Sequence, residues 1–368
     1  MGSPAISARL LEALLESSHE VAFVVSNPDT PRGRSSRLQP TEVSALALER
    51  NLPLFRPQTL KNGAITGELE AFRVDLIVVF AYGRLLPPDV FELPPAGTIN
   101  LHASILPLLR GASPIQSALL EGFTETGWSI QFIAAGMDTG DVLSEVRLSV
   151  DPDETAGELT ERLVPAGVQL MLDTLETLGK AMQQGGDVRQ LATPQNHERS
   201  THCRKITSEM ARIDWSRSAL EIHNTIRALN PKPIARTTIL TADGGALKIH
   251  RTRLLDMATL ESLTDFQTGD AITPENLKAM APGQLLAVRL AAAPALASGS
   301  DRADSGAPGS VAGGQKSAAP RPAVLVTTGA GCLEILELQP ENRKKLTAKD
   351  FLNGYRKANP VLLGSTTT

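Results

Sequence analysis

The sequence has little cysteine and no long apolar run. Its two cysteines, Cys203 and Cys332, lie far apart, which excludes a disulfide framework and favours a reducing compartment. No apolar stretch approaches the roughly 20 residues that a membrane-spanning helix needs. The first residues, MGSPAI, lack the basic and apolar segments of a secretory signal. We therefore expect a cytoplasmic protein with no membrane partner.

Charge of a single sign is also missing. The 36 Lys and Arg residues nearly balance the 40 Asp and Glu residues, and the net charge of -4 excludes a uniformly basic coat for nucleic acid. The halves differ, however: residues 1–200 carry 15 basic against 25 acidic residues, and residues 201–368 carry 21 against 15. With 368 residues, 42% of them hydrophobic, the chain can build two domains with cores. The asymmetry predicts different partners for the two domains, although two unrelated solvated surfaces would give the same pattern.

The first half alternates between helix and strand signals. Apolar residues recur at helical spacing over residues 6–15, and Thr41 is a candidate N-cap for a helix over residues 41–51. Residues 75–80 (DLIVVF) are continuously apolar, as is typical of a strand buried in a parallel sheet. This alternation predicts an open, mostly parallel, Rossmann-like α/β sheet. The other expected elements are strands at residues 20–25, 98–102, 128–133 and 142–148, and a helix over residues 113–122 with Ser113 as its N-cap.

The second half has a different pattern. Alternating apolar and polar residues at 247–251 and 333–338 predict short antiparallel strands, and helices are expected at residues 219–229 and 347–355. Between the strands, 24 of the 32 residues from 291 to 322 are Ala, Gly, Ser or Pro. Such a segment buries too little apolar surface to offset the entropy of ordering it. We therefore expect a disordered insertion in a loop.

Three polar residues indicate a site for chemistry. Asn100 and His102 lie two residues apart at the end of an expected strand, so their side chains project from the same face. Ligands of open α/β sheets bind at the carboxyl ends of the strands. Asp138 follows in the loop GMDTGD, which glycines punctuate.

An amide, an imidazole and a carboxylate suit acyl transfer. His102 can accept a proton from an attacking amine, and Asp138 can orient the imidazole and stabilise its charged form. The amide of Asn100 can donate to the oxyanion of a tetrahedral intermediate. No serine or cysteine has an obvious base partner, which favours direct transfer over a covalent intermediate. On the residues alone, purely structural hydrogen bonds at these positions stay open as the alternative.

The segment NLHASILPLLRGASPIQSAL, followed by GMDTGDVL, resembles the signature of the folate-dependent formyltransferases. Further similar segments are NPDTPRGRSSRL near the start and LEILELQPENRKKLTAKDFLNG near the end, so that the resemblance covers nearly the whole chain. The segment at residues 291–322 is the main stretch outside it. The resemblance implies that a formyl group passes from 10-formyltetrahydrofolate to the amino group of methionine on the initiator tRNA.

The resemblance also implies roles for individual residues. Asn100, His102 and Asp138 match the catalytic set of the family. Residues 1–203 would form the catalytic domain and residues 204–368 a small OB-like β-barrel that binds tRNA, which agrees with the basic second half. We expect a monomer that needs no metal. The remaining matches are Ser104, Ile105, Leu106 and Pro107 for the tetrahydrofolate, and Arg34 and Arg37, in a loop that contacts the tRNA.

One departure from the family pattern bears on these expectations. The family begins with a short apolar strand ahead of a turn that stands here as Gly2-Ser3-Pro4, so we expect that the chain as written starts late and that its first strand is missing. A sugar-nucleotide or other formyl-folate-dependent formyltransferase stays open as an alternative, and the missing first strand keeps open an inactive tRNA-binding homologue. His197, His202 and Cys203 fit no common zinc spacing.

Overall fold

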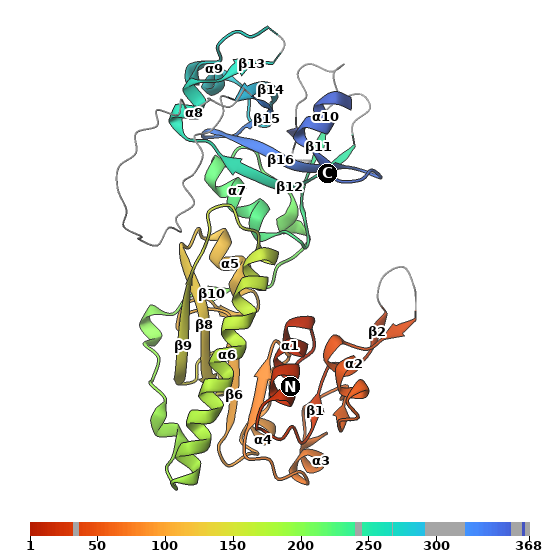
Figure 1. Ribbon diagram of the computed structural model, residues 1–368, viewed down its shortest axis with the longest axis vertical. Coiled ribbons are helices and arrows are strands. Elements are labelled where there is room, and N and C mark those ends of the chain that lie inside the picture. The colour runs from red at the N-terminus through yellow and green to blue at the C-terminus, as the bar shows by residue number, and fades with distance from the viewer. Residues whose placement is uncertain (32–36, 240–244, 267, 291–320, 355–362, 365–368) are drawn as a thin grey trace, which may run out of the picture. The chain divides into compact units, whose positions relative to one another are not determined.

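The computed structural model describes residues 1–31, 37–239, 245–266, 268–290, 321–354 and 363–364. The chain folds into two units, Met1–Ile206 and Thr207–Thr368 (Figure 1). Within the described residues, no helix combines the length and the apolar character needed to cross a membrane.

The sheet of the first unit has the order β5-β6-β8-β9. β5 (Ile77–Phe80) pairs in parallel with β6 (Thr98–His102), and β8 (Glu125–Phe132) and β9 (Val142–Ser149) extend the sheet in antiparallel fashion. The sheet is thus mixed, and the strand expected at residues 98–102 is confirmed over its whole length. A second parallel pair is formed by β1 (Val24–Val25) and β4 (Leu54–Phe55).

Met1 and Gly2 lie between the two groups of strands. Gly2 forms a parallel bridge with Phe80 and donates its amide hydrogen to the carbonyl oxygen of Val25 (3.1 Å). The α-ammonium group of Met1 donates to the carbonyl oxygen of Val78 (2.6 Å). Two residues therefore connect β1 to β5 at one end of these strands.

A cavity of about 360 Å³ continues from Met1 between β1 and β5. Its lining includes residues 19–24 on one side, residues 72–78 on the other, and Leu10 and Leu14 of the first helix. The strand expected at residues 20–25 is shortened to Val24–Val25 because its first residues face this cavity instead of a neighbouring strand.

Helices cover the sheet of the first unit. Thr41 accepts a hydrogen bond from the amide of Ser44 and caps its helix, as expected. Ser113 precedes the helix that starts at Pro114, but its hydroxyl accepts from the amide of Ile206 (3.3 Å) instead of capping that helix. The helices are α1 (Ala5–Glu16), α2 (Glu42–Glu49), α3 (Thr66–Glu70), α4 (Pro88–Phe91), α5 (Pro114–Leu120) and α6 (Ala156–Gln183).

Two short strand pairs and two 3-10 turns complete the first unit. β2 (Thr30–Pro31) and β3 (Leu38–Gln39) form an antiparallel hairpin. β7 (Arg110–Gly111) pairs in parallel with β10 (His202–Cys203). The 3-10 turns η1 (Val188–Leu191) and η2 (His197–Arg199) lie between α6 and β10 in the chain.

The contact between α6 and the sheet depends on a glycine. Trp128 of β8 is fully buried, packs against the ring of Phe80 and donates its indole hydrogen to the carbonyl oxygen of Leu163 (2.7 Å). A Cβ atom on Gly167 of α6 would lie 2.8 Å from two atoms of the Trp128 ring. Trp128 is thus a core residue, and the helix can approach it only through glycine.

The substitution Gly167→Ala is expected to lower the free energy of unfolding by about 1–3 kcal/mol, because the methyl group overpacks the site around Trp128. The matched control is Gly179→Ala in the same helix, where a Cβ atom would meet no atom within 4 Å. The control is expected to raise the free energy of unfolding by about 0.5–1 kcal/mol through helix propensity. Urea unfolding measures both; equal effects of the two substitutions would contradict the packing argument.

The second unit is an antiparallel sheet that curls into a half-barrel. Its strand order is β13-β14-β15-β16-β12-β11-β18, and β17 also pairs with β16. The predicted class, an α/β domain followed by a small OB-like β-domain, is thereby confirmed. The strands are β11 (Ala235–Ile239), β12 (Ala246–Leu254), β13 (Thr264–Asp265), β14 (Leu285–Leu290), β15 (Arg321–Thr327), β16 (Cys332–Pro340), β17 (Leu346–Thr347) and β18 (Leu363–Gly364).

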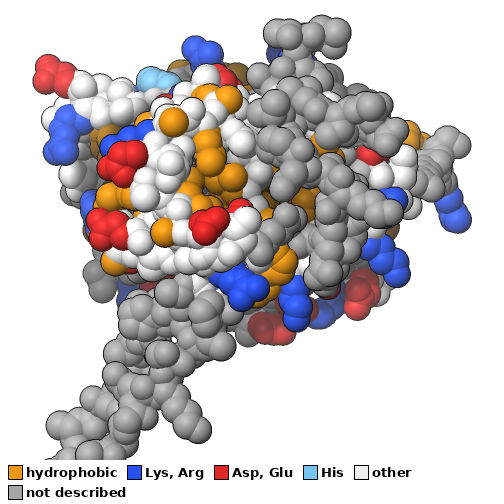
Figure 2. Space-filling model, turned by 90° about the horizontal axis from the view of Figure 1, so that it is seen from above, with side chains coloured by type: hydrophobic (Ala, Val, Ile, Leu, Met, Phe, Trp, Pro, Cys, Tyr) orange, Lys and Arg blue, Asp and Glu red, His pale blue; other side chains and the backbone are white. Residues whose placement is uncertain are grey.

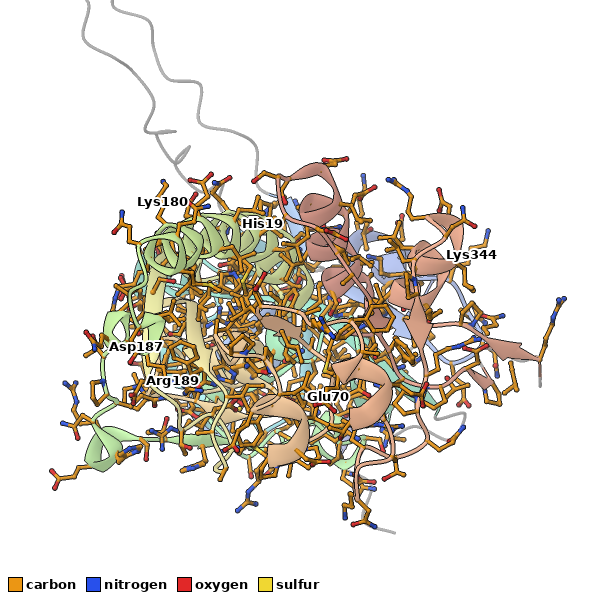
Figure 3. The ribbon with its side chains drawn as sticks, turned by 90° about the horizontal axis from the view of Figure 1, so that it is seen from below. His19, Glu70, Lys180, Asp187, Arg189 and Lys344 are labelled. Atoms are coloured by element: carbon orange, nitrogen blue, oxygen red, sulfur yellow. The ribbon has the colours of Figure 1, made fainter. Side chains whose placement is uncertain are left out.

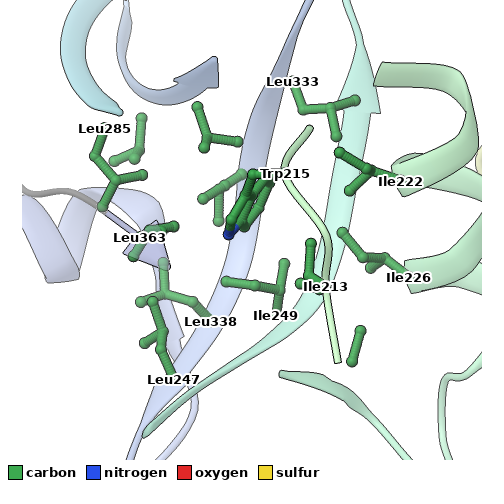
Figure 4. Close-up of a cluster of buried hydrophobic side chains, with 14 of the residues drawn as sticks. Ile213, Trp215, Ile222, Ile226, Leu247, Ile249, Leu285, Leu333, Leu338 and Leu363 are labelled. Atoms are coloured by element: carbon green, nitrogen blue, oxygen red, sulfur yellow. The ribbon is translucent and has the colours of Figure 1, made fainter. Parts of the chain in front are cut away.

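Trp215 lies at the centre of the apolar core of this unit (Figure 4). Its indole donates to the hydroxyl of Thr237 (2.9 Å), and Ile222 and Ile226 pack into the same cluster from one helix. That helix begins with a capping box between Ser218 and Glu221. The helical elements are η3 (Glu209–Ala211), α7 (Ala219–Ala228), α8 (Met257–Glu261), α9 (Pro274–Ala279) and α10 (Ala348–Gly354).

The segment rich in small residues connects two paired strands. β14 ends at Leu290 and pairs in antiparallel fashion with β15, which begins at Arg321. Arg321 and Pro322 therefore belong to the sheet, and the expected insertion is two residues shorter at this end. Its expected disorder concerns residues 291–320, which lie outside the described residues.

Candidate active site

Asn100 and His102 lie on β6, which pairs with β8. Asn100 stands opposite Gln131 in the antiparallel register, and His102 stands opposite Ser129. Directly opposed residues of an antiparallel pair point to the same face, so Asn100, His102 and Gln131 share one face of the sheet.

Asp138 reaches this face from the loop between β8 and β9. The loop turns at Asp138 itself, which has a φ angle of 52°. One carboxylate oxygen, Oδ1, accepts from Nε2 of Gln131 (3.0 Å), and the other, Oδ2, accepts from the amide of Gly111 (2.8 Å). Oδ2 also lies 3.6 Å from Nδ1 of His102. Residues 36 positions apart in the sequence thus form a histidine–carboxylate pair.

The imidazole of His102 is held at both nitrogens. The side chain is 6% exposed, and Nε2 lies 3.0 Å from the carbonyl oxygen of Leu109. A carbonyl oxygen only accepts, so the hydrogen of a neutral ring is assigned to Nε2. Nδ1 is then the nitrogen that can take up a proton, and a proton there faces the carboxylate of Asp138. The arrangement suits a general base.

The loop after β6 is held by hydroxyl groups. Ser129 donates from Oγ to the carbonyl oxygen of Ser104 (2.8 Å) and accepts from the amide of Leu106 (3.0 Å). Ser104 donates from Oγ to the carbonyl oxygen of Leu108 (2.6 Å). Ser104 and Leu106 are buried, whereas Ile105 and Pro107 are partly exposed. The segment expected to bind folate therefore has a fixed backbone directly after His102.

The two arginines expected to contact tRNA fall, in the sequence, between or next to β2 and β3. Arg37 directly precedes β3 and is exposed. Arg34 falls between the two strands and lies outside the described residues. Pro31 of β2 pairs with Leu38 of β3, so the residues that flank this loop lie next to each other.

Several buried residues of the site are not among the predicted site residues. Arg110 is 3% exposed, and its guanidinium group donates to Oε1 of Gln195 (2.6 Å) and lies 3.0 Å from Nδ1 of His197. Gln131 and Gln195 are also buried. Gln195 lies far from the other site residues in the sequence, so spacing gives no signal for it; Arg110 lies inside the segment already singled out.

No group of three or more His, Cys, Asp and Glu side chains in the described part of the chain could hold a metal ion. Cys203 is buried beside Ser113, whose amide donates to its sulfur (3.3 Å). Burial is the largest of the effects that raise the pKa of the Cys203 thiol, and the nearby charge of Asp138 raises it further. Cys203 is therefore a packing residue and not a nucleophile.

Comparison with known proteins agrees with this fold. Residues 1–175 match the family model "Formyl transferase", and residues 205–356 match "Formyl transferase, C-terminal domain". The chain belongs to the formyltransferase family, as the sequence motifs predict.

The curated relatives are more specific. A methionyl-tRNA formyltransferase from Leptospira interrogans is 38% identical over 360 residues, which are 96% of this chain and 96% of the relative. Proteins of the same name from Alkaliphilus oremlandii and Symbiobacterium thermophilum are 32% and 34% identical and cover 99% and 96% of this chain, with 98% and 91% of their own lengths aligned.

Solved structures with a similar fold have distant sequences. A sugar 3N-formyl transferase is 16% identical, with a TM-score of 0.53 and coverage of 93% of this chain and 97% of its own. An N-formyltransferase from Helicobacter canadensis is also 16% identical, with a TM-score of 0.52 and coverage of 94% and 97%. At this identity the likeness supports the fold alone.

Proposed function

We propose that the protein transfers the formyl group of 10-formyltetrahydrofolate to the amino group of methionine on initiator Met-tRNA, and so serves translation initiation. The observation that carries the proposal is the pairing of His102 Nδ1 with Asp138 Oδ2 at 3.6 Å, on the face of β6 that also bears Asn100. The full-length similarity to methionyl-tRNA formyltransferases supplies the substrates.

His102 acts as the general base. The neutral amine of methionine attacks the formyl carbon, a nitrogen–carbon bond forms, and the carbonyl becomes an oxyanion. The amine loses its proton to Nδ1 of His102, since Nε2 is engaged with the carbonyl oxygen of Leu109 (3.0 Å). Asp138 pairs with the imidazolium that results. When the intermediate collapses, the bond to N10 of the folate breaks and the imidazolium returns the proton to N10.

Asn100 acts on the oxyanion. Its amide can donate to the negative oxygen of the tetrahedral intermediate, and a donor fixed on a strand needs little reorganisation. The loop of Ser104, Ile105, Leu106 and Pro107 holds the folate next to these side chains. Its hydrogen bonds to Ser129 keep it in place before substrate arrives.

The test of the proposal is a formyl transfer assay with purified protein and 10-formyltetrahydrofolate. Initiator Met-tRNA and amino-sugar nucleotides are offered as alternative acceptors in parallel. We expect formylation of Met-tRNA alone. Transfer to an amino-sugar nucleotide would replace the proposal by a sugar-nucleotide formyltransferase, and tRNA binding without any transfer would replace it by an inactive tRNA-binding homologue.

We assign catalysis to residues 1–203 and tRNA binding to residues 204–368 as part of the same proposal. The basic excess of the second half supports phosphate binding. On the face seen in Figure 2, Lys and Arg side chains lie mainly at the margins, among acidic ones and around hydrophobic side chains. The protein acts as a cytoplasmic monomer in this proposal, which light scattering on the purified chain checks.

Arg34 and Arg37 are proposed to contact the tRNA from the β2–β3 hairpin. The substitution Arg34→Ala is expected to raise KM for Met-tRNA roughly 5- to 10-fold and to lower the slope of log affinity against log salt by about one, since one phosphate contact is lost. KM for the folate should stay unchanged. The control is Arg9→Ala, an exposed arginine that pairs with Glu161. Equal losses toward both substrates would contradict the assignment.

A further inference from the structure

We propose that Gln195 is a positioning residue that fixes Asp138 against His102 and thereby sets the rate of formyl transfer. The inference rests on the proposed function, because that reaction supplies its main readout. It concerns a residue that lies 57 positions beyond Asp138 and is 7% exposed.

The amide of Gln195 joins the backbone and the side chains around Asp138. Its Nε2 donates to the carbonyl oxygens of Gly140 (2.6 Å) and Asp138 (3.0 Å), and it lies 3.2 Å from Oε1 of Gln131. Gln131 in turn donates from Nε2 to Oδ1 of Asp138 (3.0 Å). Gln195 therefore holds both the loop that carries the carboxylate and the amide that orients it.

The other end of Gln195 is fixed by a buried cation. Oε1 accepts from Nε and Nη2 of Arg110 (3.1 and 2.6 Å). Arg110 precedes Gly111, whose amide donates to Oδ2 of Asp138. Both oxygens of the carboxylate are thus held by groups that Gln195 links, so a shift of this side chain moves the acceptor that faces Nδ1 of His102.

The segment that carries Gln195 crosses the site as a strap, residues 193–203. The strap begins after η1. In η1, the guanidinium group of Arg189 lies 5.4 Å from the centre of the Phe132 ring. Asp187 and Arg189 of this region are labelled in Figure 3. Thr193 bridges Val142, and the strap ends in β10, which pairs with β7. The strap is therefore attached on both sides of Gln195.

The decisive variant is Gln195→Glu. A carboxylate keeps an acceptor for Arg110 but places a negative oxygen against the carbonyl oxygens of Asp138 and Gly140, where a donor is needed. We expect kcat to fall roughly 10- to 100-fold, because misplacement of a catalytic group by about 1 Å is enough for such a loss. KM for both substrates should stay within about twofold. The matched control is Gln190→Glu, the same change at an exposed glutamine of η1.

Two further measurements separate positioning from folding and from the proposed function. In an Asp138→Asn background, the Gln195→Glu loss should shrink to less than threefold, whereas full additivity would overturn the inference. The NMR signals of the His102 ring should shift in Gln195→Glu but not in Gln190→Glu, whether or not Met-tRNA is the substrate. If Gln195→Glu does not fold, Gln195→Asn decides, since its shorter side chain cannot span Arg110 and Gly140. An unchanged kcat and unchanged ring signals would sink the inference.

Discussion

Formyl transfer by His102→Ala is expected to fall by about 10²- to 10⁴-fold in kcat, the range that removal of a general base produces. The physical reason is the state of the amine. The amine must lose a proton as it attacks. In the structure Nδ1 of His102 is the ring nitrogen that can accept this proton, since Nε2 is hydrogen-bonded to the carbonyl oxygen of Leu109. Single-turnover rates with Met-tRNA and formyl-folate measure this step without interference from product release.

A second variant guards against a structural effect, because His102 is buried and bonds to the backbone. His102→Gln retains a side-chain N–H that can donate to the carbonyl oxygen of Leu109 but cannot take up a proton at neutral pH. It is expected to lose as much activity as His102→Ala while it unfolds at the wild-type temperature. The control is His202→Ala, an exposed imidazole of the same unit. Retention of a tenth or more of the wild-type rate by His102→Gln would rule out the general base.

The sequence predicts one part of this site, Asn100 and His102, better than the other, Asp138. Asn100 and His102 lie on one strand, and a period of two suffices to place them on one face. The position of Asp138 depends on the register of β8 against β6 and on a loop with a positive φ angle. Local periodicity does not encode such tertiary pairings, so the sequence suggests the carboxylate by its residue type and the family motif, and does not predict its position.

Sequence patterns miss Gln195, and they predict a longer strand at residues 20–25 than the structure has. Gln195 has no local pattern because its importance comes from four backbone and side-chain partners in distant segments. Residues 20–25 have strand character, but a strand is completed by its neighbour, and most of this stretch borders a cavity. Propensity describes a segment by itself, whereas pairing and burial depend on what lies beside it.

The second large effect is expected in the pH dependence of stability of a chain that starts at Met1, because in such a chain the α-ammonium group is buried. Loss of contact with water lowers its pKa from 8.0 to about 5. The unfolded chain keeps the ordinary value, so between pH 5 and pH 8 it binds a proton that the folded chain does not. The free energy of unfolding therefore increases as the pH is raised from 5 to 8. Three pKa units correspond to about 4 kcal/mol.

Acetylation of Met1 isolates this group. An acetylated terminus carries no charge, keeps one hydrogen for the carbonyl oxygen of Val78, and has the adjoining cavity of about 360 Å³ for its methyl group. Urea unfolding at pH 5, 6, 7 and 8 is compared for the free and the acetylated chain, with Met1 verified by mass.

Other groups that titrate near this window affect both chains equally. Burial also lowers the pKa of His250, so the free energy of unfolding of both chains rises with pH below pH 6.5, and the difference between the two curves belongs to Met1. Carboxyl groups such as Asp214 and Glu221, whose hydrogen bonds lower their pKa values, titrate below this window. Parallel curves would mean that the ammonium group reaches water, and the terminus would then not be enclosed between β1 and β5.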